Sequence, residues 1–192
     1  QASILRSWAR HPYSMMAGLD ASFDGVMFTG YHSAASMPTN PLSHTMNGRN
    51  VYVKINDIIC PELFINALTA AYEGKPIYLL TGDKGLCEWL HKMNANIPTV
   101  AVSEGMGGAS LSINPHLAVK RIREAAEKAL SIDPKKLMFP MPDHFRVEIA
   151  FRNHTFATNG SHYPGCVQLD STRVAFESND YMDVLKFFYW VL

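Results

Sequence analysis

Residues 26–36 are VMFTGYHSAAS, an apolar run that leads into a loop of small residues containing His32. A short apolar run before such a loop predicts a buried β-strand. In α/β proteins, the loops that leave the ends of buried strands carry much of the chemistry. A second histidine, His44, lies in residues 42–46, LSHTM. These segments therefore predict an α/β chain with a histidine-containing site at the end of a strand.

The composition is that of a globular chain. It has 192 residues, 47% of them hydrophobic, and its 17 Lys and Arg residues balance 17 Asp and Glu residues. The most basic stretch, residues 120–123, lies on a helical pattern that also carries Glu124 and Glu127. This arrangement is typical of a solvated helix face and not of a nucleic-acid site. The longest apolar run, residues 184–192, contains Lys186 and is too short to cross a membrane.

Cysteine usage favours a reducing compartment. Cys60, Cys87 and Cys166 are far apart, odd in number and form no Cys-x-x-Cys pair. Disulfide frameworks and zinc sites built from cysteine use paired or closely spaced residues. Residues 1–10 show no apolar core of a signal peptide. We therefore expect a cytoplasmic protein that binds neither nucleic acid nor a membrane.

Strand and helix patterns alternate over the first two thirds of the chain. Proline and glycine mark several boundaries, as Pro61 and Gly74 do for one helix. Repeated strand–helix units predict a mostly parallel sheet covered by helices. Strands are expected at residues 25–29, 51–55, 76–80 and 99–102, helices at 61–73, around 88–92 and from 115, and a Gly- and Ser-rich loop at 103–112.

The pattern changes after the proline-punctuated connector at residues 134–142. Residues 145–151 alternate apolar and polar, residues 173–176 read as another strand, and a helix begins at Asp180. This tail predicts a smaller β-rich C-terminal subdomain. We expect an α/β metal-site domain at residues 1–133, with an α+β subdomain at 134–192 packed on it.

The candidate site combines two histidines with a carboxylate. Glu62 follows Pro61 at the start of a predicted helix, beyond the loop that contains His32 and His44. Imidazole and carboxylate groups suit zinc, and histidine also carries protons near neutral pH. The three residues therefore predict a metal hydrolase site, although their spacing is not a specific motif.

Several segments, in order along the chain, are similar to a known family. They are HPYSMMAGLD at residues 11–20, GYHSA at 30–34, LSHTM at 42–46, IND at 55–57 before Glu62, NA at 66–67, LTGD at 80–83, VEIAF at 147–151 and PG at 164–165. On these residues the chain resembles the D-stereospecific aminopeptidases of the DppA type, which are zinc metallopeptidases. The resemblance covers nearly all of the chain and corresponds to the C-terminal two thirds of the family.

The resemblance implies a two-zinc hydrolase that releases D-amino acids from the N-termini of short peptides. His32 and Glu62 match zinc ligands of the family. His44 matches its catalytic histidine, described there as a nucleophile, and a general acid/base role is chemically equally suitable. Asn66 is a candidate for holding the amine or carboxylate of the substrate. The resemblance also implies a ring-shaped homo-oligomer.

Part of the ligand set of the family has no counterpart here. The N-terminal strand of the family supplies an Asp-x-Glu pair, a later segment supplies another histidine, and the resemblance begins after all three. His11 lies in the segment matching Pro-x-Ser-Met and is not the missing ligand. We therefore expect half of a two-zinc site in this chain. The alternative function is a non-catalytic remnant that binds peptides or forms oligomers.

Other polar groups have simpler interpretations. Asp83, after a predicted strand, could line the site or cap a helix, and capping is the favoured interpretation. His91 falls on an amphipathic helix, and His116 follows a helix start. The tail histidines at 144, 154 and 162 form only a weak second metal-site candidate. Residues 105–108 are GMGG and lack the Gly-Lys-Ser/Thr end of a phosphate-binding loop.

Overall fold

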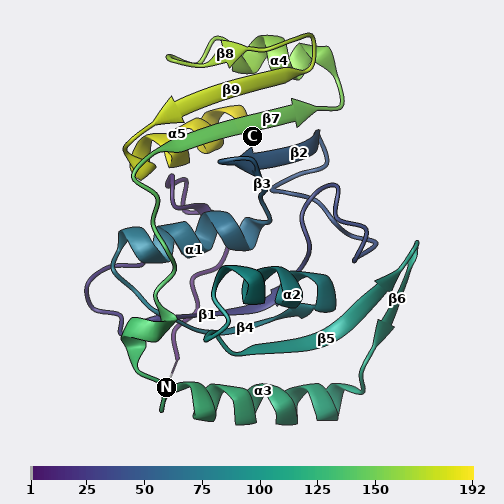
Figure 1. Ribbon diagram of the computed structural model, residues 1–192, viewed down its shortest axis with the longest axis vertical. Helices are drawn as coiled ribbons and strands as arrows, with labels where there is room; N and C mark the ends of the chain where they lie inside the picture. The colour runs from purple at the N-terminus through teal and green to yellow at the C-terminus, as the bar shows by residue number, and fades with distance from the viewer. Residues whose placement is uncertain (1) are drawn as a thin grey trace.

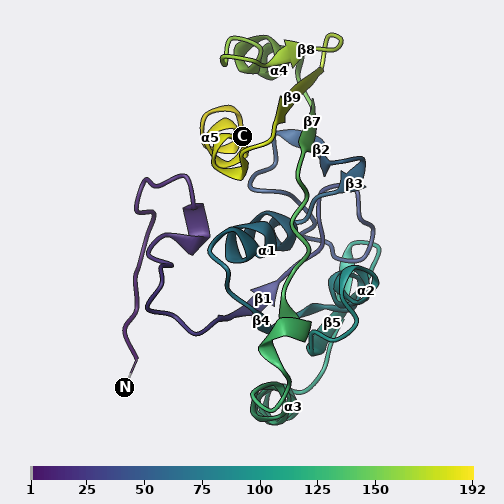
Figure 2. The ribbon, with the colours of Figure 1, turned by 60° about the vertical axis from the view of Figure 1, so that its left-hand side comes forward.

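A computed structural model describes residues 2–192 and confirms the α/β fold (Figure 1). Two sheets lie at opposite ends of the molecule, and helix α1 (Glu62–Tyr72) lies between them in both views (Figures 1 and 2). Eight buried residues line α1, among them Leu63, Phe64 and Leu68. Since a helix that is apolar on most sides needs neighbours all round, its sequence suits this central place.

The first sheet has the strand order β1-β4-β5-β6. Its strands are β1 (Val26–Tyr31), β4 (Ile77–Asp83), β5 (Thr99–Met106) and β6 (Ala109–Ser112). The pairs β1–β4 and β4–β5 are parallel, as the alternating pattern predicted, and β6 runs antiparallel to β5. Helices α2 (Lys84–Met93) and α3 (Pro115–Ala129) both contact β4 and β5. The strand that precedes the predicted histidine-containing site, β1, belongs to this sheet.

The prediction of a loop at residues 103–112 is wrong. Those residues complete β5 and form β6, a hairpin with Ser103 opposite Ser112 and a turn at Gly107, where φ is +60°. Every residue of β6 is exposed, and the hairpin extends away from the rest of the molecule (Figure 1). Because glycine has low strand propensity and β6 buries neither face, the sequence carries no alternating apolar signal there.

The second sheet is antiparallel and has the order β3-β2-β7-β9-β8. Its strands are β2 (Asn50–Ile55), β3 (Ile58–Ile59), β7 (Phe145–Phe151), β8 (Val167–Gln168) and β9 (Arg173–Ser178). The tail strands β7 and β9 lie where the sequence predicted them. Strands β2 and β3 come from the first region of the chain, so this sheet crosses the predicted boundary at residue 133. The division into two domains therefore stays a prediction.

The remaining elements are short or cover the second sheet. They are the 3-10 helices η1 (Ser14–Met16) and η2 (Pro134–Leu137), helix α4 (His154–Gly160), which the sequence did not predict, and helix α5 (Tyr181–Val191). Helix α5 contacts β7, β9 and α1, and one hydrophobic cluster runs through α1, α5 and strands of both sheets. No helix among the described residues is both long enough and apolar enough to span a membrane.

Candidate metal centre

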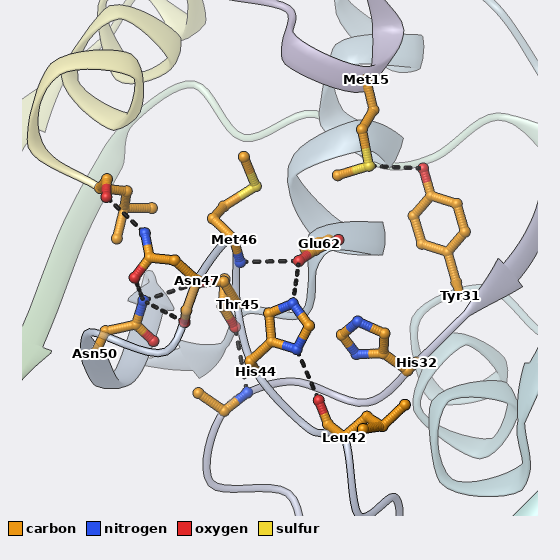
Figure 3. Close-up of polar contacts among 12 residues, drawn as sticks. Met15, Tyr31, His32, Leu42, His44, Thr45, Met46, Asn47, Asn50 and Glu62 are labelled. Carbon is orange, nitrogen blue, oxygen red and sulfur yellow. Dashed lines mark hydrogen bonds and ion pairs between the residues drawn. The ribbon is translucent and has the colours of Figure 1, made fainter. Parts of the chain in front are cut away.

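The structure brings His32, His44 and Glu62 together (Figure 3). One ligand atom from each side chain can be chosen so that all three atoms lie within 4.8 Å of one another. The imidazole rings of His32 and His44 have their centroids 4.3 Å apart. Within residues 2–192 no other group of three such side chains converges in this way. Three residues separated by up to 30 positions in sequence thus form one cluster.

Each of the three side chains comes from a different local feature. His32 directly follows β1, whose last residue, Tyr31, pairs with Gly82 of β4. His44 lies further along the same connection, before β2. Glu62 is the first residue of α1, after Pro61 at the N-cap. A carboxylate in the first turn of a helix is favoured by the positive end of the helix dipole, so this position suits Glu62 without a cation.

The hydrogen bonds of the two imidazoles assign their tautomers. Nδ1 of His32 lies 2.9 Å from the carbonyl oxygen of Ser33. Nδ1 of His44 lies 2.7 Å from the carbonyl oxygen of Leu42 (Figure 3). A carbonyl oxygen only accepts, so Nδ1 carries the proton in each ring. In the neutral rings both Nε2 atoms then keep a lone pair. This is the form in which histidine binds a metal ion or accepts a proton.

The facing acceptors of His44 and Glu62 favour a cation beside them. Nε2 of His44 lies 3.5 Å from Oε1 of Glu62, and the side chains are 40% and 14% exposed. A neutral imidazole with its proton on Nδ1 and a carboxylate are both acceptors there, so they repel unless a proton or a metal ion lies near them. An imidazole nitrogen and a carboxylate, which His32 and Glu62 supply, are ligands that zinc prefers. The donor set therefore fits a zinc site.

The two residues that follow His44 anchor its loop through hydrogen bonds to Cys60 and Glu62. The backbone N–H of Met46 donates to Oε1 of Glu62 at 2.9 Å, from a left-handed backbone with φ of 64° (Figure 3). The buried hydroxyl of Thr45 donates to the carbonyl of Cys60 at 2.8 Å. A methionine at positive φ is uncommon and is retained where the surroundings require it. Here that conformation aims a backbone donor at Glu62.

Asn66 lies near the cluster, but its side-chain amide already donates a hydrogen bond within the protein. It is 1% exposed, and its Nδ2 donates to the hydroxyl of Tyr31 at 2.8 Å. Burial raises the pKa of Tyr31 to about 12, and the charge of Glu62 adds to this rise against the opposing hydrogen bond from Asn66. Asn66 therefore holds Tyr31 next to the site, and its predicted contact with substrate remains a prediction.

Asp83 caps a helix and also binds Ser33, the residue that follows His32. Its carboxylate accepts from the backbone N–H of Leu86 at 2.9 Å, which caps α2. It also accepts from the backbone N–H and the hydroxyl of Ser33, both at 2.6 Å. The local sequence favoured the capping role, but the contact with Ser33 links residues 50 positions apart and has no local signal.

The other histidines of the described part of the chain do not form a second metal site. His144 lies beside Asn179 and Glu177. His91 lies 3.2 Å from the carbonyl of Cys87, one turn earlier on α2. His154 begins α4 and is exposed. Among the described residues the tail histidines are not part of any group that could hold a metal ion.

Two hollows are lined by residues that neighbour the cluster. A cavity of about 200 Å³ is lined by Met46, Ile65 and residues of α5, including Leu185 and Phe188. A larger, open groove of about 780 Å³ runs along β1 and ends at Tyr31, with Met15 on its wall. Both have mostly apolar linings, and each reaches a residue that contacts or directly precedes the cluster.

Known proteins match the chain over almost its whole length. A family model with the description D-aminopeptidase matches residues 1–190. The D-aminopeptidase of Bacillus subtilis (strain 168) is 30% identical over 177 residues, which are 91% of this chain and 64% of that protein. The structure of the Zn-dependent D-aminopeptidase DppA from Bacillus subtilis, a self-compartmentalizing protease, aligns with a TM-score of 0.82 and 29% identity. That alignment covers 92% of this chain and 65% of DppA, so the chain spans slightly less than two thirds of these relatives.

Proposed function

The chain belongs to the D-aminopeptidase family, and from this premise we propose that it acts as a zinc-dependent aminopeptidase on short peptides with an N-terminal D-amino acid. The family inferred from the ordered sequence segments is thereby confirmed. The observation that carries the proposed activity is the convergence of His32, His44 and Glu62 within 4.8 Å. The activity and the substrate are proposals, because the relatives are longer than this chain.

Zinc would be held here by Nε2 of His32 and the carboxylate of Glu62. When bound, zinc lowers the pKa of a water molecule and polarises the peptide carbonyl. Ser33 and Met46 support these two ligands, since the Ser33 carbonyl accepts from the ring of His32 and the Met46 N–H donates to Glu62. A centre with two zinc ions is proposed from the family resemblance and needs more ligands than these.

His44 is proposed as the residue that moves protons. Its Nδ1–H is held by the Leu42 carbonyl, which leaves Nε2 as an acceptor facing the cluster. From that position it can take a proton from the attacking water and return it to the amine that leaves when the peptide bond breaks. A nucleophilic role is the alternative, and the same nitrogen would act in it.

The structural relative bears on assembly, and the free cysteines bear on location. DppA is a self-compartmentalizing protease, and on this basis we propose that the chain assembles into a ring-shaped homo-oligomer. Its three free cysteines suit a reducing compartment, and we propose the cytoplasm. Exposed apolar side chains on two elements could serve such contacts. Trp190 of α5 is 73% exposed, and Met106 and Leu111 of the β5–β6 hairpin are 66% and 63% exposed.

The proposed activity is tested with His44→Ala, Glu62→Gln and a control. His44→Ala should lower turnover of D-Ala-D-Ala by about 100-fold or more, the usual loss for a general acid or base, and should leave the zinc content unchanged. Glu62→Gln should lower the zinc content, measured by elemental mass spectrometry. His116→Ala, which alters an exposed histidine at the start of α3, should change neither quantity.

Each outcome has a separate meaning. Activity retained in His44→Ala contradicts the role of that histidine, and unchanged zinc in Glu62→Gln contradicts the ligand assignment. If the unaltered protein contains zinc and binds the dipeptide but does not hydrolyse it, the non-catalytic alternative replaces the enzyme. Isothermal titration with the dipeptide separates binding from turnover.

A further inference from the structure

Asp83 is a deeply buried carboxylate with four hydrogen-bond donors around it. It ends β4, caps α2 and is 1% exposed. Oδ1 accepts from the hydroxyl of Ser33 and the N–H of Leu86, and Oδ2 accepts from the N–H of Ser33 and Nδ2 of Asn40. An ionised carboxylate only accepts, so each oxygen is matched by two donors. Buried carboxylates are usually held by cations, whereas this one is held by neutral groups from one loop and a helix.

One chain of hydrogen bonds runs from Asp83 to the first imidazole. Asp83 fixes the backbone N–H and the hydroxyl of Ser33, both at 2.6 Å. The carbonyl of the same serine accepts from Nδ1 of His32 at 2.9 Å. The orientation of Ser33 therefore sets the position of the group that holds the His32 ring.

A second chain of hydrogen bonds runs from Asp83 to the other imidazole. Nδ2 of Asn40 donates to Asp83 at 3.1 Å, and Oδ1 of Asn40 accepts from the N–H of Leu42 at 2.9 Å. The carbonyl of Leu42 then accepts from Nδ1 of His44 at 2.7 Å. Both chains thus begin at one carboxylate and end at the Nδ1 atom of a different histidine.

Three glycines allow the connection that carries His32 and His44 to lie close to Asp83. A Cβ atom on Gly82 would lie 2.3 Å from the carbonyl oxygen of Tyr31. A Cβ on Gly85 would lie 2.3 Å from the Thr39 hydroxyl, and one on Gly105 would lie 2.5 Å from the Thr39 carbonyl oxygen. Real Cβ atoms do not approach so closely. The three glycines come from β4, α2 and β5, and together with Asp83 they form a cradle for residues 31–40.

We propose that Asp83 is a positioning residue that fixes the orientation and the tautomer of both His32 and His44. This inference rests on the proposed function of those histidines. The nitrogen of a histidine that carries the proton is set by the partner of the ring, and outer hydrogen-bond partners orient the residues that bind a metal. Asp83 holds both partners at once, so it leaves the Nε2 lone pair of each histidine available in the cluster with Glu62.

Asp83→Asn tests the proposal with little change in shape. The substitution replaces one acceptor oxygen by an NH₂ group, which then faces an N–H donor whichever way the amide turns. The metal-free protein should show both neutral tautomers of His32 and His44 in long-range ¹H–¹⁵N spectra of the imidazoles at pH 8. The unaltered protein should show Nδ1–H alone. Zinc affinity, measured by competition with a chromogenic chelator, should fall by about 10- to 100-fold, as it does when such outer partners are removed.

Asp180→Asn is the matched control. Asp180 caps α5 by accepting from the N–H of Met182 at 2.9 Å, so the same chemical change is made at another helix cap. This variant should keep the tautomers and the zinc affinity of the unaltered protein. A thermal melt of each variant records any loss of stability separately from the histidine spectra.

Two further variants separate the two chains of hydrogen bonds. Ser33→Ala removes the hydroxyl that donates to Asp83 and should change the spectrum of His32 more than that of His44. Asn40→Ala removes the link to Leu42 and should change His44 more than His32. These variants leave the cap of α2 intact, so they decide the question if Asp83→Asn does not fold.

The outcomes distinguish this inference from the proposed function. Unchanged tautomers and zinc affinity in folded Asp83→Asn would overturn the positioning role, as would equal effects of Ser33→Ala and Asn40→Ala on both rings. If the unaltered protein binds no zinc but Asp83→Asn still alters both tautomers, the positioning role stands and the proposed metal site fails.

Discussion

Asp83 and Glu148 are two buried carboxylates, one on each sheet, and their surroundings differ in kind. Asp83 ends β4 and is held by neutral donors from residues that are distant in sequence. Glu148 lies in the middle of β7, where it accepts from Tyr52 at 2.6 Å and from Arg173 at 3.2 Å. Arg146, on the same strand, lies 3.4 Å from its second oxygen. Asp83 orients an irregular connection, whereas Glu148 links neighbouring strands.

The difference follows from the structural elements that supply the hydrogen-bond partners of each carboxylate. The partners of Glu148 lie on β2, β7 and β9, whose pairing is fixed by an antiparallel register. Such cross-strand contacts stabilise a sheet whose geometry the ladder already sets. Apart from Leu86 of α2, the partners of Asp83 lie on the irregular connection between β1 and β2, which has no ladder to fix it. We therefore expect Glu148 to contribute to stability alone, and Asp83 to contribute to the site as well.

The largest effect on stability is expected for Glu148→Gln. The change removes the charge on which Arg146 and Arg173 converge, and hydrogen bonds to charged groups contribute about 1.5–3 kcal/mol. We expect the free energy of unfolding in urea to fall by about 2 kcal/mol, with unchanged zinc affinity.

The control for Glu148→Gln is Glu177→Gln on the same sheet. The side chain of Glu177 is 56% exposed and also pairs with Arg146. Exposed ion pairs contribute little, so its loss should cost less than about 1 kcal/mol. A fall in zinc affinity in Glu148→Gln would break the comparison, because it would show that the second sheet also positions the histidines.

A smaller effect is expected for Gly105→Ala. The added methyl group would meet the carbonyl of Thr39, which also accepts the N–H of Gly105 at 2.9 Å. We expect the connection to shift, with a loss of about 1 kcal/mol in unfolding free energy and a fall in zinc affinity. Gly108→Ala is the control on the same hairpin, since a Cβ there meets nothing within 4 Å. Equal behaviour of the two variants would argue against the cradle.

The smallest effect is the response of the second sheet to acid. Burial raises the pKa of Glu148, but hydrogen bonds from Tyr52 and Arg173 and the charges of both arginines outweigh it, so the pKa lies below its usual value of 4.5. A lowered pKa gives stability that is present above the usual value and is lost as the pH falls below it.

We therefore expect the metal-free protein to lose stability between pH 5 and pH 3 more steeply than Glu148→Gln does. The difference should be less than about 1 kcal/mol, since a full unit of pKa shift corresponds to 1.36 kcal/mol. Urea unfolding at each pH measures it. Parallel curves for the two proteins would show that the arginines do not lower the pKa of Glu148.

Much of the fold was readable from local sequence. Alternation of apolar and polar side chains located β7, and Pro61 with Gly74 bounded α1 to within two residues. The apolar run before His32 located β1 and the connection that carries both histidines. These features depend on neighbours in sequence, whose periodicity reports which face of an element is buried. Ordered segments of the chain were also enough to identify its family.

The tertiary structure decided which distant residues meet. Nothing in the local sequence indicates that β2 joins the antiparallel sheet, because a strand with alternating polarity can pair in either sheet. Likewise Asp83 carries an ordinary helix-cap signal, and its contacts with Ser33 and Asn40 depend on the parallel pairing of β1 with β4. The types of residue at the site were set by the sequence, whereas the convergence of His32, His44 and Glu62 required long-range packing, which periodicity does not encode.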